Sequence, residues 1–320
     1  MFDFVGMLVI VAVAIVFFLL ARRANRLRNA VVRWLALGPS ILLAAIAATL
    51  AITGLVGSWK LNFPGSYPLQ RDVKAEATPA RLARGKQIAA ICGECHSAKL
   101  DGPLDGRNFF EPGEGPPIGT LYAPNLTPAG EISEWSDAEV IRAIREGIHK
   151  DGRALAIMPS AVFHNMSDED VMSIVAYLRT QPPSGARSPS TKLNVMAAEF
   201  FGLGMFPTSA QPHITRPVVA PPAGPDAAYG RYLISIGNCT ECHGEDLKGR
   251  VPKGPGPPAA PNMIAITSAW DVDGFIRTFR TGIDPTGHKI NGEMPWQSVS
   301  RFASDDDLRA IYAYLRTLKP

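Results

Sequence analysis

All four cysteines of the 320-residue chain lie in two copies of one pentapeptide. The first copy is Cys92-Gly93-Glu94-Cys95-His96, and the second is Cys239-Thr240-Glu241-Cys242-His243. A single Cys-x-x-Cys-His arises by chance in roughly one chain per thousand of such composition, and two copies that use every cysteine are far rarer. Both copies are therefore expected to carry the same chemistry.

This motif is typical of covalent haem attachment. Two thiols one helical turn apart can form thioethers with the haem vinyl groups, and the histidine that follows can reach the iron. A thioredoxin-like redox pair or half of a zinc site needs no histidine there and does not account for the duplication. The sequence thus predicts two covalently bound haem c groups with their iron. The predicted binding residues are Cys92, Cys95, His96, Cys239, Cys242 and His243, and the two histidines are the expected proximal iron ligands.

An iron that only transfers electrons needs a second strong ligand, commonly a methionine thioether, which keeps substrates away from the metal. Met158 and Met294 occupy equivalent places in the two copies, and each is followed by proline. We therefore predict that Met158 and Met294 complete the two iron sites. The competing side chains have no counterpart of the same type in the other copy, and such residues are more often exposed or part of a core. These competitors are His149, His164, Met166, Met263 and His288.

Two further repeated features are candidates for supporting the haems. Gly115-Pro116-Pro117 and Gly256-Pro257-Pro258 could supply the backbone carbonyl that accepts a hydrogen bond from the second ring nitrogen of a proximal histidine. Trp135 and Trp270 could wall a haem or bond a propionate, although a role in an ordinary core is equally frequent for tryptophan.

The haem motifs belong to a longer internal repeat, which predicts one fold present twice. The first copy also carries an insertion that includes residues 108–113 and is expected to form a surface loop. The matching segments are Arg84 to Cys92 with Arg231 to Cys239, Ala123-Pro124-Asn125 with Ala260-Pro261-Asn262, Met158-Pro159 with Met294-Pro295, and Ala176 to Thr180 with Ala313 to Thr317.

The repeat units read as helical. Helices are expected before each haem motif, over residues 137–146 and 272–281, and at the end of each copy. Ser167 and Ser304, each followed by acidic residues, are N-cap signals for the two final helices. No run of alternating residues favours a sheet. The predicted fold class is mostly α, with two cytochrome c-type haem domains in tandem behind a two-helix transmembrane hairpin.

The hairpin is predicted from two apolar runs, Phe4 to Ala21 and Leu35 to Val56, each able to span about 30 Å of hydrocarbon as a helix. A cleavable signal peptide is the alternative for the first run, but its positive charges should precede the apolar stretch. By the positive-inside rule the loop between the runs is cytoplasmic, and the chain after about residue 58 is on the periplasmic side of the inner membrane. The basic residues between the runs are Arg22, Arg23, Arg26, Arg28 and Arg33.

The predicted division has four segments. They are the hairpin (1–58), a first haem domain (75–181, the first repeat), a proline-rich linker (182–226) and a second haem domain (227–320, the second repeat). Within the linker, residues 195–206 are apolar, and two interpretations stay open. They pack on one of the haem domains, or they contact the membrane or a partner subunit.

The first repeat also contains a series of short motifs beside the predicted ligands. They are Ile118 to Pro128, Trp135-Ser136-Asp137, Arg145 to Ile148, Lys150-Asp151-Gly152, Met158-Pro159 and Ser167 to Leu178. These motifs resemble the multihaem cytochrome c subunits of membrane-bound bacterial dehydrogenase complexes of the alcohol, gluconate and molybdenum hydroxylase type. The resemblance implies the same fold and haem ligation. Those subunits usually carry three haem motifs and a C-terminal membrane attachment, whereas this chain has two motifs and an N-terminal hairpin.

The predicted function is electron transfer by a membrane-anchored dihaem cytochrome without catalytic residues of its own. The expected donor is a dehydrogenase or respiratory-complex subunit, and the acceptor is another cytochrome, a quinone or an oxidase of the respiratory chain. A net charge of +3, from 32 basic and 29 acidic residues, gives no indication of a nucleic-acid surface. The alternatives are an integral subunit of a respiratory or photosynthetic complex and a dihaem peroxidase-like enzyme, which would need a displaceable distal ligand.

Overall fold

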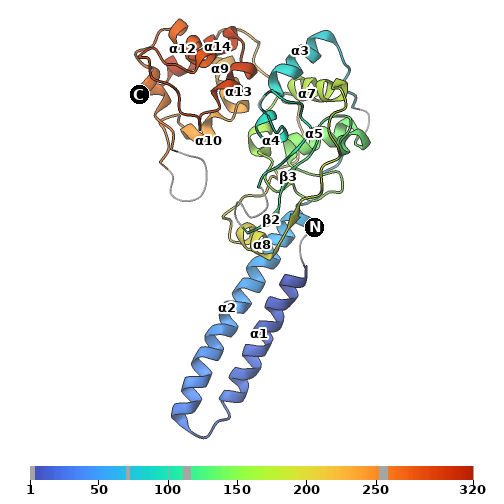
Figure 1. The fold of residues 1–320 in the computed structure, drawn as a ribbon, viewed down its shortest axis with the longest axis vertical. Coiled ribbons are helices and arrows are strands. Elements are labelled where there is room, and N and C mark those ends of the chain that lie inside the picture. The colour runs from blue at the N-terminus through green and yellow to red at the C-terminus, as the bar shows by residue number, and fades with distance from the viewer. Residues whose placement is uncertain (1–3, 70–72, 100, 111–116, 252–258, 320) are drawn as a thin grey trace.

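The computed structural model describes residues 4–69, 73–99, 101–110, 117–251 and 259–319. In Figure 1 a long helical hairpin extends from one end of the molecule, and two mostly helical units lie at the other end. The first repeat sits above the hairpin, and the second repeat lies beside the first.

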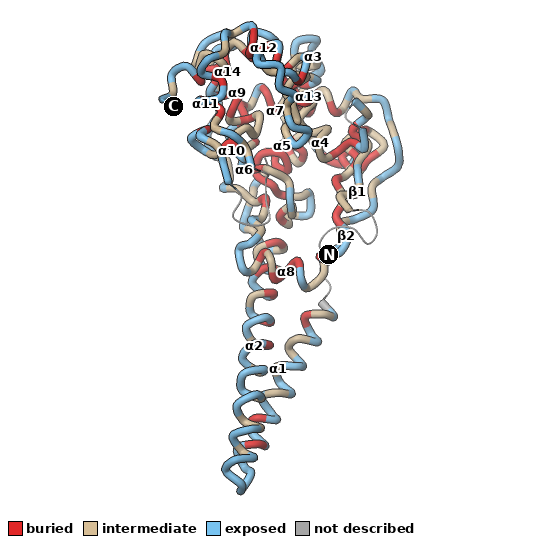
Figure 2. Tube along the Cα trace, turned by 60° about the vertical axis from the view of Figure 1, so that its left-hand side comes forward, coloured by how far each residue is buried: buried red, intermediate tan, exposed pale blue. Residues whose placement is uncertain are grey.

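The hairpin consists of α1 (Phe4–Ala24) and α2 (Ala30–Asn62). Asn29 begins the second helix, because its side-chain oxygen accepts hydrogen bonds from the backbone N–H groups of Val31 and Val32. Both helices are long and apolar enough to cross a membrane, judged by length and composition. Figure 2 shows that most of the hairpin is exposed, although its side chains are apolar.

The helices of the first repeat surround the first haem motif. Ser136 caps the helix predicted over residues 137–146 through a capping box with Glu139, and Ser167 caps the last helix of the repeat. The helical elements are α3 (Pro79–Ile88), α4 (Gly93–His96), the 3₁₀ turn η1 (Glu131–Glu134), α5 (Asp137–Glu146), α6 (Ser160–Phe163) and α7 (Asp168–Thr180). Two antiparallel strand pairs of two residues each complete the unit: β1 (Arg107–Asn108) with β3 (Tyr122–Ala123), and β2 (Gly119–Thr120) with β4 (Lys192–Leu193).

The second repeat has the same helix order. A capping box at Ser304 begins its last helix, as the sequence indicates. The elements are α9 (Ala227–Ile236), α10 (Cys239–His243), α11 (Met263–Thr267), α12 (Val272–Thr281), α13 (Trp296–Phe302) and α14 (Asp305–Thr317).

A glycine brings the first and last helices of each repeat together. A Cβ atom on Gly85 would lie 1.9 Å from the carbonyl oxygen of Ser173, and one on Gly230 would lie 1.9 Å from that of Ala310. Ser173 and Ala310 are equivalent in the repeat, so the two glycines are equivalent as well. The sequence comparison matched Arg84 to Cys92 with Arg231 to Cys239 without a gap. For these helices that alignment is wrong by two residues. The second repeat accommodates the extra residues just before its haem motif, where Asn238 has a φ of 58°.

The two repeats pack directly on each other rather than being held apart by the linker. Their buried apolar residues form one continuous core. The Tyr232 hydroxyl donates to the Asp170 carboxylate at 2.6 Å and accepts a hydrogen bond from the Ser167 backbone N–H at 3.0 Å. Glu94, inside the first haem motif, accepts a hydrogen bond from Ser298 of α13. The described parts of the two repeats therefore form one structural unit.

The linker contains one further helix, α8 (Val195–Gly202), which packs across α2. The two backbones approach closely at glycines: a Cβ atom on Gly57 would lie 1.9 Å from the carbonyl oxygen of Ala198, and one on Gly202 would lie 1.8 Å from that of Thr53. Lys60 donates to the carbonyl oxygen of Phe201 at 3.2 Å. A small apolar cluster that includes Ile118 and Leu121 joins the same junction to the first repeat. The apolar linker segment thus packs both on the hairpin and on the first repeat.

Candidate functional site

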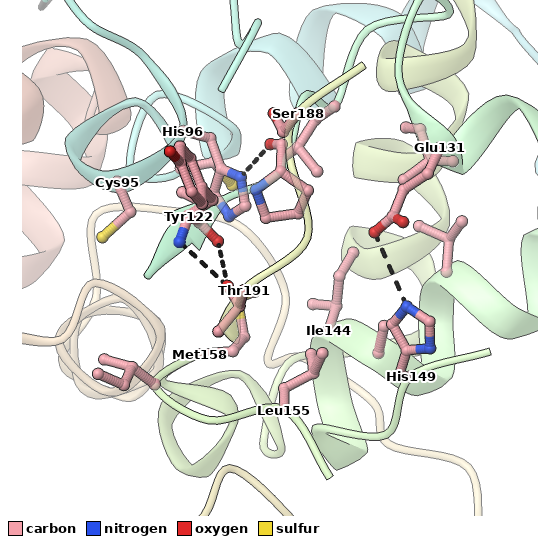
Figure 3. Close-up of a pocket in the computed structure, with 18 of the residues that line it drawn as sticks. Cys95, His96, Tyr122, Glu131, Ile144, His149, Leu155, Met158, Ser188 and Thr191 are labelled. Carbon is pink, nitrogen blue, oxygen red and sulfur yellow. Dashed lines mark hydrogen bonds and ion pairs between the residues drawn. The ribbon is translucent and has the colours of Figure 1, made fainter. Parts of the chain in front are cut away.

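The first haem motif forms a single helical turn, because the His96 backbone N–H donates to the Cys92 carbonyl at 2.8 Å. Cys92, Cys95 and His96 all line one cavity in the first repeat. Figure 3 shows Cys95 and His96 at this cavity, with Met158 also on its wall. The spacing predicted from the sequence therefore directs both thiols and the imidazole toward the same space.

His96 is buried and has the geometry of an oriented metal ligand. Its Nδ1 lies 2.8 Å from the Pro124 carbonyl oxygen, which fixes Nδ1 as the donor and leaves Nε2 with its lone pair. Burial lowers the pKa of the His96 imidazole and thereby favours the neutral ring. A neutral imidazole held in this way can donate its Nε2 lone pair to iron.

The second motif repeats this arrangement. His243 is buried, and its Nδ1 lies 3.0 Å from the Pro261 carbonyl oxygen. Its Nε2 is a buried nitrogen without a hydrogen-bond partner in the part of the chain that the structure describes. A buried polar atom without a partner is unfavourable, and an iron at this position would remove that penalty.

The carbonyl that orients each histidine differs from the expected one. It belongs to the proline of the repeated Ala-Pro-Asn motif, Pro124 and Pro261, and the expectation that Gly-Pro-Pro segments supply it is wrong. Of those segments only Pro117 falls within the described residues, and its carbonyl accepts from Asn194 instead. The sequence contained this signal, because Ala-Pro-Asn is repeated after both haem motifs.

The burial of the cysteines fits thioethers better than thiolates. Desolvation raises the pKa of the Cys92 thiol to about 12 and that of the Cys239 thiol to about 12. An uncharged thioether sulfur has no such desolvation penalty in an apolar wall. Within the described ranges no group of three or more His, Cys, Asp or Glu side chains is placed to hold a metal ion, so the zinc alternative lacks a ligand set there. The residues present therefore fit a covalently attached haem.

Met158 lines the same cavity as His96. Its loop has the same backbone in both repeats: the following prolines have ψ angles of 52° (Pro159) and 55° (Pro295). The methionine carbonyls accept equivalent hydrogen bonds, at 2.8 Å for Met158 and 2.7 Å for Met294. Met294 is partly buried against the core. The predicted equivalence of the two loops thus holds in the backbone, while ligation of iron by either sulfur stays a prediction.

Two of the competing side chains in the first repeat also line the cavity. His149 has its Nδ1 2.9 Å from Asp151, its Nε2 3.8 Å from Glu131, and its ring edge against Trp135 at a centroid distance of 4.7 Å. Met166 is fully buried in the wall. The carboxylate partners of His149 place it at a polar rim, as Figure 3 shows for its contact with Glu131.

The remaining competitors have other environments. His164 has its Nδ1 3.1 Å from the Arg145 carbonyl oxygen. Met263 is buried in the core of the second repeat, and His288 is exposed. The Trp135 side chain lines the cavity, which agrees with the interpretation that it walls a haem. For Trp270 the structure gives a backbone contact: its carbonyl accepts a hydrogen bond from the Tyr312 hydroxyl at 2.7 Å.

The sequence did not identify a basic rim on the first cavity. Arg153 and Arg187 line it, together with the linker residues 188–191. Arg187 also pairs with Glu134 at 2.6 Å. Guanidinium groups at the edge of an otherwise apolar cavity suit the carboxylates of a haem. The role of the linker residues in the cavity wall was not predicted, because a proline-rich stretch is typical of an extended spacer.

The fold and the paired motifs define a class of small haem-binding electron carriers. The sequence pattern of the family Cytochrome c matches residues 82–182 and again residues 227–319. The chain therefore belongs to the cytochrome c family, whose members bind haem c covalently, and the expected fold class is confirmed.

Curated relatives agree with the resemblance seen in the sequence. The chain is 29% identical over 269 residues to one of the subunits of the nicotinate dehydrogenase of Pseudomonas putida, covering 75% of this chain and 21% of that protein. It is 27% identical over 270 residues to the cytochrome c subunit of the quinone alcohol dehydrogenase of Gluconobacter oxydans (76% and 56%), and 28% identical over 278 residues to the fructose dehydrogenase cytochrome subunit of Gluconobacter japonicus (76% and 54%). The chain thus spans about a fifth of the first relative and little more than half of the other two.

Proposed function

We propose that this chain is a membrane-anchored dihaem c-type cytochrome that carries electrons from a partner dehydrogenase or reductase to the respiratory chain. The observation that carries the proposal is the repeated proximal geometry. In each repeat a buried histidine follows a cysteine pair, and a proline carbonyl holds its Nδ1. Two such sites in one chain support two haems.

The proposed ligand sets come from equivalent positions. Cys92, Cys95, His96 and Met158 serve the first haem, and Cys239, Cys242, His243 and Met294 serve the second. Each haem supplies reversible one-electron transfer between ferric and ferrous iron. Among the chain's own residues, Pro124 and Pro261 fix the histidine tautomers, and Met158 and Met294 would be the further ligands that hold the iron. With a histidine and a methionine as ligands, the bound haem would exchange electrons and would have no free position for substrate.

The direct packing of the repeats supports a relay between the haems. Glu94 lies inside the first haem motif, and its partner Ser298 belongs to the helix that follows the Met294 loop. The proposed segments are the hairpin (1–58), the haem domains (75–181 and 227–320) and the linker (182–226).

The proposed location is the periplasmic face of the inner membrane. It is supported by the two apolar helices and by the arginines gathered at the turn between them. The names of the relatives support a dehydrogenase as the electron donor. The acceptor is proposed to be another cytochrome, a quinone or an oxidase.

Isolation of the full-length holo-protein with its native complex tests this function. We expect two covalent haems per chain, and one in the Cys239→Ser/Cys242→Ser double variant. The copurified dehydrogenase, supplied with its substrate, should reduce both haems rapidly. Steady turnover of peroxide by the half-reduced protein would instead favour the dihaem peroxidase class, because such an enzyme loses one distal ligand at half reduction.

A further inference from the structure

The length of α2 exceeds the thickness of a bilayer core. Its 33 residues extend roughly 50 Å at about 1.5 Å per residue, whereas the hydrocarbon core is about 30 Å thick. Arg33 marks the end of the helix beside the arginine-rich turn. About 20 residues are needed to cross the core from there, which places Thr53 near the opposite boundary. The last turns of α2, up to Asn62, therefore lie at the outer interface.

α8 crosses α2 in this same stretch. Its contacts are with Thr53, Gly57 and Lys60, which share one face of α2. At about 100° per residue, Trp59 lies roughly 120° around the helix from the face that α8 covers, and Phe63 is the residue that directly follows α2. Their exposed fractions are 61% and 66%. Two large aromatic side chains are thus exposed at the end of α2, beside the face that α8 covers.

α8 and the turn after it carry further exposed apolar side chains. Met196 is 41% exposed, Leu203 58% and Met205 54%. The acidic residue of this helix, Glu199, is buried and accepts a hydrogen bond from Thr53. The sequence has no Asp or Glu between Asp3 and Asp72. Within the described residues of α2, α8 and the turn after it, the junction therefore presents an apolar surface without exposed carboxylates.

This surface is continuous with the exposed apolar surface of the hairpin, where Ile52 and Leu55 are also exposed. Aromatic residues gather at membrane interfaces, and short helices with one apolar face lie in the interface plane. A partner subunit would require no such position along α2. The length of the helix and the aromatic side chains together favour lipid as the occupant.

We propose that Trp59, Phe63, Met196, Leu203 and Met205 form a collar, called here the interfacial collar, that lies in the lipid headgroup region. The inference rests on the proposed membrane anchorage. The collar seats the first repeat on the bilayer, because β4 pairs with β2 and the Ala154 N–H donates to the Leu61 carbonyl at 2.7 Å.

Site-directed spin labelling of the full-length holo-protein in vesicles of phosphatidylethanolamine and phosphatidylglycerol tests the collar. Single cysteines replace Leu203 or Met205, and the four native cysteines are occupied by haem. Leu42→Cys, 61% exposed in the middle of α2, is the lipid control, and Val219→Cys, 84% exposed in the linker, is the water control. Collisions of each label with oxygen and with a water-soluble nickel complex are then compared.

We expect collisions with the nickel complex to be at least about threefold rarer at positions 203 and 205 than at position 219, because the collar lies at the interface. The frequency of collisions with oxygen at positions 203 and 205 should lie between those of the two controls. If positions 203 and 205 match position 219 while position 42 stays in lipid, the collar is overturned and the anchorage stands. If position 42 also matches position 219, the proposed anchorage itself fails. Shielding of 203 and 205 from both reagents would mean a protein contact and would also overturn the collar.

Discussion

Asn125 follows Pro124, whose carbonyl orients His96, and its hydrogen bonds fix this part of the backbone. Its backbone N–H donates to the Ser188 hydroxyl at 2.9 Å, and its side-chain amide donates to the carbonyls of Ser184 and Ala186 at 2.8 and 3.0 Å. The equivalent Asn262 instead caps α11 by accepting from the Ala265 N–H at 2.9 Å. Among the described residues, the linker therefore supports the proximal side of the first site through Asn125, whereas the Asn262 side chain of the second repeat caps a helix.

Replacing Asn125 by alanine should loosen this support. We expect a loss of about 1–3 kcal/mol in the free energy of unfolding, because buried carbonyl groups lose their donors. The potential of the first haem should shift as His96 loses its fixed orientation. Asn262→Ala is the matched control and should cost about 1 kcal/mol without moving the first potential. Equal effects of the two changes in redox titrations would contradict this account.

The methionine assignment makes a spectroscopic prediction. Met158→Ala and Met294→Ala should each remove half of the weak Met-to-iron absorption at the red end of the visible spectrum, because each iron loses its thioether ligand. Met166→Leu, a change of similar volume in the wall of the first cavity, should leave the band unchanged. An intact band in Met158→Ala, together with a loss on changing His149, would assign the first iron differently.

Repetition made the residue-level predictions possible. Each haem motif could be checked against its copy, and so could the methionine loops. The basic rim at Arg153 and Arg187 could not be found in this way. Arg187 and residues 188–191 of the same wall belong to the linker, and the linker has no copy in the internal repeat. The orienting carbonyl was missed for a different reason: several segments, Ala-Pro-Asn among them, are repeated after the haem motifs, and every residue in them has a carbonyl group that could accept the hydrogen bond.

The start of each capped helix could be predicted from residues that are close together in the sequence. The helix expected over 137–146 was found as α5, with a capping box at Ser136, and the final helices begin after Ser167 and Ser304. α8 was not expected as a helix, because the prolines around it favour extended chain. Its position on α2 depends on two glycines that are far apart in the sequence, and no local pattern reports such a contact.

The crossing of α2 and α8 can be tested at Gly57. A Cβ atom there would meet the Ala198 backbone, so Gly57→Ala must push the helices apart and should lower stability by about 1–3 kcal/mol. Gly38→Ala lies in the same helix, and its Cβ would have no atom within 4 Å. This control should be neutral or gain up to about 1 kcal/mol. Thermal unfolding in detergent measures both, and similar melting temperatures would argue against the close crossing.

At the scale of the whole molecule, hydrogen bonds to buried carboxylates hold the two repeats together. Arg84 pairs with Asp170 at 2.8 Å within the first repeat, and Tyr232 of the second repeat donates to the same carboxylate. Gln87 donates to Asp307 of the second repeat at 2.5 Å. The sequence could not predict this contact, because it joins surfaces that the internal repeat does not duplicate.

This contact predicts a loss of stability in alkaline solution. Burial raises the pKa of Tyr229 to about 12, and burial and the nearby Asp170 also raise the pKa of Tyr232. An unfolded tyrosine ionises near pH 10, so the folded state holds its protons more tightly and stability falls as the pH rises from about 10 to about 12. Denaturant titrations of Tyr229→Phe and Tyr232→Phe should show a shallower decline. Tyr314→Phe, outside the contact, should keep the slope of the native protein.

The position of α13 against the first haem motif also bears on biogenesis. Cys92 lies in a buried wall, and Glu94 beside it is in contact with the second repeat. A haem-attaching enzyme needs access to both thiols, so we expect the first thioether bonds to form before the second repeat docks. In the proposed topology the first motif would leave the membrane first, because it lies between α2 and the second repeat along the chain. For the proposed dihaem protein we therefore expect haem insertion to proceed in the order in which the chain is translocated.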